Sequence, residues 1–196
     1  MLPNPENTSE LSSIPVKGLF TIPLRNNLLY DYEWGGVALN DTSQGLYYRL
    51  WKLSYNKLTY ELSIKRADSS ESTVLLTIQD ITRVGLAFDF NMNPQIIYEV
   101  AGQTYFYWYD PALAAYTTIV IPDAKNACIS LDDARDIAAG LNDILLVYQK
   151  ETGLYYRRQR DRYQVEYFLT ASIPENVKLH QVGMNNKMRF QFMFKG

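Results

Sequence analysis

The sequence predicts an all-β protein made of blade-like β-meander repeats, a small or incomplete propeller-like fold, with a β-sandwich as the alternative. Three observations lead to this prediction. Short apolar runs alternate with Gly, Pro, Asn and Asp at intervals of about nine to twelve residues, which is typical of strands joined by turns. A segment recurs in the chain after about fifty residues. The 16 tyrosines among 196 residues suit strands and wet interfaces.

The apolar runs give the expected strands in chain order. They cover residues 18–22, 28–33, 46–55, 58–66, 73–79, 84–90, 95–100, 104–109, 116–121, 127–131, 143–149, 153–160, 164–171, 177–182 and 187–194. One segment competes for helix, because residues 130–133 read as a capping box and Gly140 would end the helix. The repeat assigns that segment to a strand and a loop, so we expect at most one short helical turn there.

The repeat defines the expected organisation of the chain. Residues 142–148 resemble residues 93–98, residues 153–161 resemble residues 102–110, and each unit closes on an Ile-Pro pair, Ile121-Pro122 and Ile173-Pro174. We therefore expect a flexible arm at 1–15, an N-terminal β unit at 16–80, and a β-repeat region at 81–196. That region would hold blade-like units at 84–122 and 127–174 and a partial unit at 177–194. Two full units fall short of the four or more blades of a closed propeller, so the fold would be irregular or would close with a neighbouring chain.

Composition narrows the classes of function. The formal net charge of −2 argues against a general binder of nucleic acid, with DNA passing through a channel as the exception. No apolar run approaches the length of a membrane span, and residues 1–13 do not resemble a signal peptide, so we expect no membrane insertion. Cys128 is the only cysteine, which excludes an internal disulfide. No motif requires a cofactor or a metal.

Rings and arginines mark the candidate interaction residues. The expected strand 104–109 carries large rings on both faces, as in stacked blades or an oligomer interface. In the next unit, the equivalent expected strand 153–160 carries arginines at its outer end. These arginines would either pair within the chain, with Asp161, Glu166 or the acidic loop of Asp132, Asp133 and Asp136, or present a surface to another subunit or to DNA. The residues in question are Tyr155, Arg157, Arg158, Arg160, Arg162, Tyr105 and Trp108.

Catalytic chemistry is poorly supported, and the sequence predicts that the chain is not an enzyme. His180 is the only histidine and has no nucleophile motif to serve. A propeller-type glycoside hydrolase remains an alternative, because Asp89, Glu99, Asp110 and Glu166 supply carboxylates. A carbohydrate-binding host-attachment module is another, because Trp34, Trp51 and Trp108 could stack on sugars.

A family resemblance goes further than the residue chemistry. It rests on the order of five segments, residues 88–94, 107–110, 129–135, 155–162 and 182–192. In that order they resemble small virion structural proteins of short-tailed bacteriophages, over about residues 84–194. The resemblance implies a non-enzymatic structural component of a phage tail, such as a nozzle, hub, adaptor or fibre-attachment subunit. It would assemble in the bacterial cytoplasm as a homo-oligomer, contact other tail or connector proteins, and meet a host receptor at most indirectly.

Overall fold

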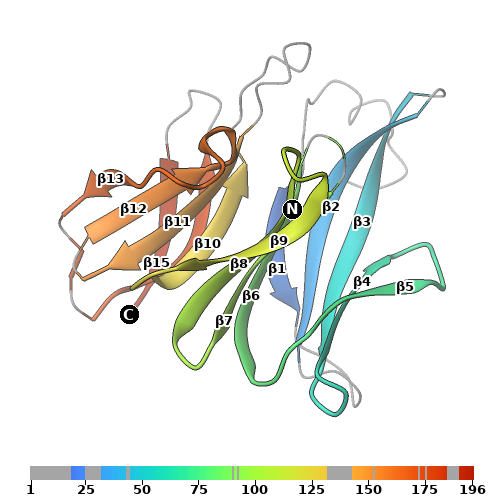
Figure 1. Cartoon of the computed structure of the whole chain (residues 1–196), viewed down its shortest axis with the longest axis horizontal. Helices are drawn as coiled ribbons and strands as arrows, with labels where there is room; N and C mark the ends of the chain where they lie inside the picture. Colours follow the sequence, from blue (N-terminus) through green and yellow to red (C-terminus); the bar gives the residue numbers. More distant parts are fainter. Residues whose placement is uncertain are drawn as a thin grey trace.

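A computed structural model gives the fold (Figure 1). It describes residues 19–24, 32–42, 45–89, 91, 93–131, 143–151, 153–171, 173–174, 176–184 and 190–196. The expected arm at 1–15 and the acidic loop with its helical turn lie outside these residues. Within them the chain forms fifteen strands and no α-helix, so the all-β prediction is confirmed.

The strands form four antiparallel sheets, each a meander in which consecutive strands pair. The first sheet contains β1 (Leu19–Leu24), β2 (Tyr32–Thr42), β3 (Gly45–Asn56), β4 (Glu61–Arg66) and β5 (Ser72–Thr77). The second contains β6 (Ile81–Phe88), β7 (Pro94–Val100), β8 (Gln103–Asp110) and β9 (Ala115–Ile121). The third contains β10 (Lys125–Leu131), β11 (Ile144–Lys150), β12 (Gly153–Arg158) and β13 (Tyr167–Thr170). The fourth contains β14 (Lys178–Met184) and β15 (Phe190–Lys195).

The sheets pack face to face in chain order. Figure 1 shows the third sheet on the left, the second in the middle and β2 to β5 on the right. A first core joins the first and second sheets through Leu53, Tyr55, Leu62, Ile64, Val84, Leu86, Phe88, Ile96 and Tyr98. A second core joins the second and third sheets through Ile97, Phe106, Trp108, Ile121, Leu146, Tyr148 and Tyr163. A third core joins the third and fourth sheets through Cys128, Val147, Leu154, Leu179 and Val182.

Alternation along the strands explains why the two middle sheets are buried on both faces. Ile96 and Tyr98 enter the first core, whereas Ile97 between them enters the second. In β11, Leu146 and Tyr148 face the second core and Val147 faces the third. Side chains of a strand point alternately to opposite faces, so a sheet with neighbours on both sides needs continuous apolar runs. The result is an open stack of sheets, and the described residues show neither a closed barrel nor a closed propeller.

The structure corrects the repeat alignment by one residue. Val100 pairs with Gln103 across the β7–β8 turn, and Lys150 pairs with Gly153 across the β11–β12 turn. Equivalent residues of β8 and β12 therefore lie fifty positions apart, not fifty-one as expected from Gly102 and Gly153. The difference matters because a slip of one residue exchanges the two faces of a strand.

Several strand boundaries also differ from the prediction, most clearly in β2, β4 and β12. Residues 34–42 fall between the expected strands 28–33 and 46–55, yet they belong to β2 and pair along β3. Residues 57–60 belong to a turn and not to β4, because Asn56 Oδ1 accepts hydrogen bonds from the backbone N–H groups of Leu58 and Thr59 and turns the chain. The strand expected at 153–160 ends at Arg158, where a 3-10 helix (Gln159–Asp161) begins.

Candidate functional site

Two of the seven predicted interaction residues lie in the second sheet, on opposite faces of β8. The Trp108 indole is only 2% exposed and lies in the second core. Tyr105 is half-buried and stacks on Tyr98 at 5.2 Å, facing the first core. The expectation that both faces of this strand are covered therefore fits the geometry, with neighbouring sheets of the same chain as the covering layers.

The arginine-rich stretch folds into a tight turn that places Tyr163 in the second core, between the second and third sheets. Arg162 and Tyr163 adopt positive φ angles of 52° and 57°, which reverse the chain after the 3-10 helix. Tyr163 is fully buried and meets the rings of Phe106 and Trp108 edge to face at 4.6 and 5.0 Å. Its hydroxyl donates to Gln95 Oε1 at 2.7 Å. This turn therefore fastens the third sheet to the second.

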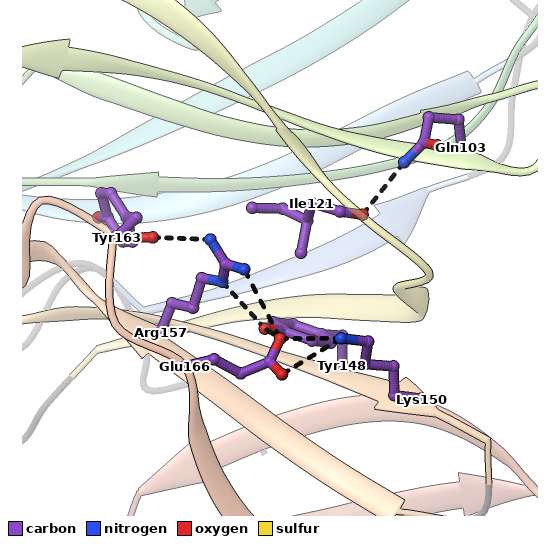
Figure 2. Close-up of polar contacts among 7 residues, drawn as sticks. All are labelled: Gln103, Ile121, Tyr148, Lys150, Arg157, Tyr163 and Glu166. Carbon is purple, nitrogen blue, oxygen red and sulfur yellow. Dashed lines mark hydrogen bonds and ion pairs between the residues drawn. The ribbon is translucent and has the colours of Figure 1, made fainter.

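Arg157 lies at the centre of a polar network between these two sheets (Figure 2). Its Nε donates to the Tyr148 hydroxyl at 3.1 Å, and its Nη1 donates to the Tyr163 carbonyl at 2.9 Å. The Glu166 carboxylate lies 3.6 Å from Arg157 Nη2 and accepts hydrogen bonds from the Tyr148 hydroxyl at 2.6 Å and from Lys150 Nζ at 3.2 Å. Two cations, one carboxylate and one phenol thus satisfy one another at the edge of the second core.

Protonation in this network is fixed by its geometry. Burial alone raises the pKa of Glu166, but the hydrogen bonds from Tyr148 and Lys150 and the charges of Lys150 and Arg157 together hold that pKa below its ordinary value. Burial, followed by the hydrogen bond to Glu166, raises the pKa of the Tyr148 phenol. Glu166 therefore stays ionised and Tyr148 stays protonated near neutral pH, so neither group is poised to transfer a proton.

Arg158 forms a second group on the opposite face of the third sheet. Its Nε pairs with Asp161 Oδ2, its Nη2 donates to the Tyr167 hydroxyl at 2.6 Å, and its guanidinium lies 4.6 Å from the Tyr167 ring. Tyr167 in turn donates to Asp161 at 2.7 Å. The hydrogen bond from Arg158, followed by that from Tyr167, lowers the pKa of Asp161. The intrachain pairing that the sequence predicted between the arginines and Asp161 or Glu166 is present in both groups.

The last two arginines pair with carboxylates that the sequence analysis did not link to them. Arg160 contacts Asp143 through both its backbone N–H and its side chain, and Arg162 contacts Asp110. The two aspartate side chains are 4% exposed, whereas those of Arg160 and Arg162 are 46% and 52% exposed. Asp110 ends β8 of the second sheet, so the packing of the second sheet on the third brings it to Arg162. Asp143 directly precedes β11 and lies opposite Arg160 in the continued register of the β11–β12 pair. The exposed sides of Arg160 and Arg162 remain accessible to a partner.

A further tie, also missed from the sequence, joins the first strands of three sheets. Arg83 of β6 donates through Nη2 to Cys128 Sγ of β10 at 3.1 Å and to the Leu179 carbonyl of β14 at 3.2 Å. Burial raises the pKa of the Cys128 thiol, and the Arg83 charge opposes this only in part, so the cysteine stays a neutral thiol. The signal in the sequence was Arg83 itself, the only charged residue of an otherwise apolar strand.

The other candidates for chemistry lie apart from one another. His180 is exposed on β14. Asp89 accepts hydrogen bonds from the backbone N–H groups of Asn91 and Asn93, which makes it part of the β6–β7 turn. Asp132, Asp133 and Asp136 lie outside the described residues. Within the described part of the chain, no three His, Cys, Asp or Glu side chains are arranged to hold a metal ion.

Comparison with known proteins adds no identification. No protein-family model matches the chain, and no curated protein or solved structure matches it. Among the described residues there is no helix of the length and hydrophobicity needed to cross a membrane.

Proposed function

We propose that this chain is a non-enzymatic structural subunit of a bacteriophage tail that acts by self-assembly and by contacts with other tail proteins. The sequence resemblance supports this proposal. So does an all-β stack of sheets whose charged side chains are used to fasten one sheet to the next. A subunit of a mechanically loaded particle needs such cross-ties between its layers more than it needs a mobile catalytic loop.

The observation that carries the proposal is the pairing of the arginine stretch. Arg157, Arg158, Arg160 and Arg162 each contact a carboxylate of the same chain. Partly buried ion pairs of this kind fix geometry and specificity more than they supply net stability. The exposed sides of Arg160 and Arg162 would then meet a neighbouring tail protein, with their orientation already set by Asp143 and Asp110.

The two competing functions have less support in the geometry. A glycoside hydrolase needs one carboxyl group held protonated, and Glu166, Asp110 and Asp161 all have lowered pKa values. Of the tryptophans suggested for stacking on a sugar, Trp108 is buried and Trp51 packs against the first core, while the side chain of Trp34 lies outside the described part of the structure. A glycan array and a panel of glycoside substrates would reveal either activity in the purified chain.

The direct test removes the chain from the particle. A stop codon in its gene, in the phage that encodes it, should give DNA-filled heads without complete tails, and a plasmid copy should restore them. Peptides from residues 143–171 should be found by mass spectrometry in purified wild-type tails. Complete, infectious tails that lack the chain would overturn the proposal.

The same complementation assay tests the arginine surface. A plasmid copy with Arg160→Gln and Arg162→Gln keeps hydrogen-bond donors toward Asp143 and Asp110 but loses both charges. We expect this variant to fold and yet to enter tails poorly. Normal incorporation would show that these two arginines serve only contacts within the chain. The exposed pair Arg66 and Asp68 offers the control, since Arg66→Gln should enter tails like the wild type.

A further inference from the structure

The β9 strand differs from every other edge strand in the described part of the chain. Seven strand pairings include a strand at the edge of a sheet, and six of them contain a register shift. The pairing of β8 with β9 runs without a shift from Asp110 opposite Ala115 to Thr104 opposite Ile121. Bulges are one of the devices by which proteins protect sheet edges from pairing with other chains. The β9 edge lacks that protection.

The sequence of β9 lacks the other devices as well. Its seven residues, Ala115–Ile121, include no charge and no proline. Tyr116, Thr118 and Val120 project from the same face, and all three are exposed, with Tyr116 at 38% and Val120 at 49%. A regular, uncharged and exposed edge is the type that adds another strand. In its regularity β9 resembles an interior strand.

The backbone of β9 is oriented for this pairing. The Ile121 carbonyl points back toward β8, where it accepts a hydrogen bond from Gln103 Nε2 at 3.1 Å (Figure 2). Backbone N–H and C=O groups alternate in direction along a strand, so those of Tyr116, Thr118 and Val120 point toward the open edge. Tyr116, Thr118 and Val120 thus combine exposed side chains with backbone groups that point toward the open edge.

We propose that β9 pairs with β9 of a second copy of this chain, antiparallel across a two-fold axis at Thr118. This register places Thr118 opposite Thr118 and Tyr116 opposite Val120 of the other copy. Thr–Thr pairs and aromatic–β-branched pairs are among the favourable cross-strand combinations. No like charges face each other within the paired strands, and the two second sheets become one continuous sheet. The inference names a partner for the self-assembly proposed above, and in that respect it rests on the proposed function.

The other uncharged edges fit a second copy less well. The β1 strand contains Pro23 and has a register shift between Leu19 and Ile22. The β5 strand has a register shift opposite Leu62 and Ser63, and β13 has one opposite Leu154 and Tyr155. The β13 strand is also only four residues long. Of the described edges, β9 alone therefore combines regular register, absence of charge and a self-complementary row of exposed side chains.

A cysteine cross-link tests the register. In a hydrogen-bonded antiparallel pair the Cα atoms lie about 5.5 Å apart, within the range that a disulfide can bridge. Thr118→Cys in the full chain should form a disulfide-linked dimer on mild oxidation, whereas the wild type, with its buried Cys128, and Thr73→Cys on β5 should not. Absence of a cross-link in Thr118→Cys, or an equal yield in Thr73→Cys, would overturn the proposed register.

A charge substitution tests the interface itself. Val120→Lys puts a cation on each side of the axis and should weaken dimerisation by about tenfold or more in light-scattering measurements over a concentration series. Val74→Lys on β5, which is similarly exposed, should leave the dimer unchanged. A monomeric wild type, or a dimer that resists Val120→Lys, would overturn the pairing. Because the tail test is made on particles, a monomer found in tails would overturn only this inference and leave the proposed function standing.

Discussion

The second and third sheets are two versions of one design. At a spacing of fifty residues, the stacked pair Tyr98–Tyr105 corresponds to the stacked pair Tyr148–Tyr155, and each pair faces the preceding sheet. In both sheets the third strand begins after a two-residue turn. The parts of the two sheets next to the β7–β8 and β11–β12 turns thus pack in the same way.

The outer halves of the two sheets, toward the far ends of β8 and β12, differ in chemistry at equivalent positions. In the second sheet, the Tyr107 and Tyr116 rings stack at 4.8 Å. Fifty residues after Tyr107 the chain holds Arg157, which forms an ion pair with Glu166. The position of buried Trp108 holds Arg158, which is bound to Asp161 at the surface.

The neighbouring layers account for the exchange of Trp108 for Arg158. The outer half of β8 faces the wide third sheet, so Trp108 is covered and an apolar ring is stable there. The outer half of β12 faces a fourth sheet of only two strands, so Arg158 reaches solvent. The second sheet continues into the regular seven-residue β9, whereas β13, which follows the arginine turn, has only four residues. The comparison teaches that the layer opposite a repeat, and not the repeat itself, determines how its edge ends.

Removing Tyr163 should have the largest effect, because this ring couples the two sheets. Tyr163→Ala deletes a fully buried side chain that contacts Phe106 and Trp108, and should lower the free energy of unfolding by about 3–5 kcal/mol. Urea denaturation followed by tryptophan fluorescence measures the change. Tyr163→Phe keeps the ring but leaves Gln95 Oε1 without its donor, and should cost about 1–2 kcal/mol. A loss below about 1 kcal/mol in Tyr163→Ala would contradict the coupling.

Removing Arg157 should have an intermediate effect. Arg157→Ala leaves the partly buried Glu166 with Lys150 alone as its cation and removes the donor to the Tyr148 hydroxyl. We expect a loss of about 2 kcal/mol, less than for a fully buried pair because the Glu166 side chain is 26% exposed. Arg66→Ala is the matched control, since its pair with Asp68 is 40–47% exposed and should contribute less than about 0.5 kcal/mol. Equal losses in the two variants would show that the partial burial of the Arg157–Glu166 pair adds nothing to its contribution to stability.

Much of the fold could be predicted because local patterns determined it. Turn residues and apolar runs located most strands, and the recurrence after about fifty residues located the second and third meanders. The prediction was wrong where a side chain acted on the backbone, as Asn56 does at the turn after β3. It also missed residues 34–42, which include Gly35 and Gly36 and which become a strand through their pairing with β3.

Less of the site could be predicted because its contacts connect different sheets. Asp161 and Glu166 are close in sequence to the arginines, and their pairing was expected. Asp110 lies 52 residues from Arg162, and no local pattern links the two. The alignment error of one residue had a similar origin, since Gly102 and Gly153 look equivalent although one lies in a turn and the other begins a strand.

Acidification should have the smallest effect and should act on the third sheet more than on the second. The folded-state pKa of Glu166 lies below its ordinary value, so its contribution to stability is complete above the unfolded pKa, about 4.3, and is lost as the pH falls through the folded value. In the wild type, the urea midpoint should hold from pH 7 to about 5 and fall below that. Glu166→Gln should be less stable at pH 7 but lose less on acidification, so the two curves should converge at low pH. Glu71→Gln, which removes an exposed carboxylate in a turn, should run parallel to the wild type. If the stability curve of Glu166→Gln also runs parallel to that of the wild type, the negative charge of Glu166 contributes nothing to stability. Packing alone would then stabilise the part of the third sheet around Arg157, as the ring contacts do in the second sheet.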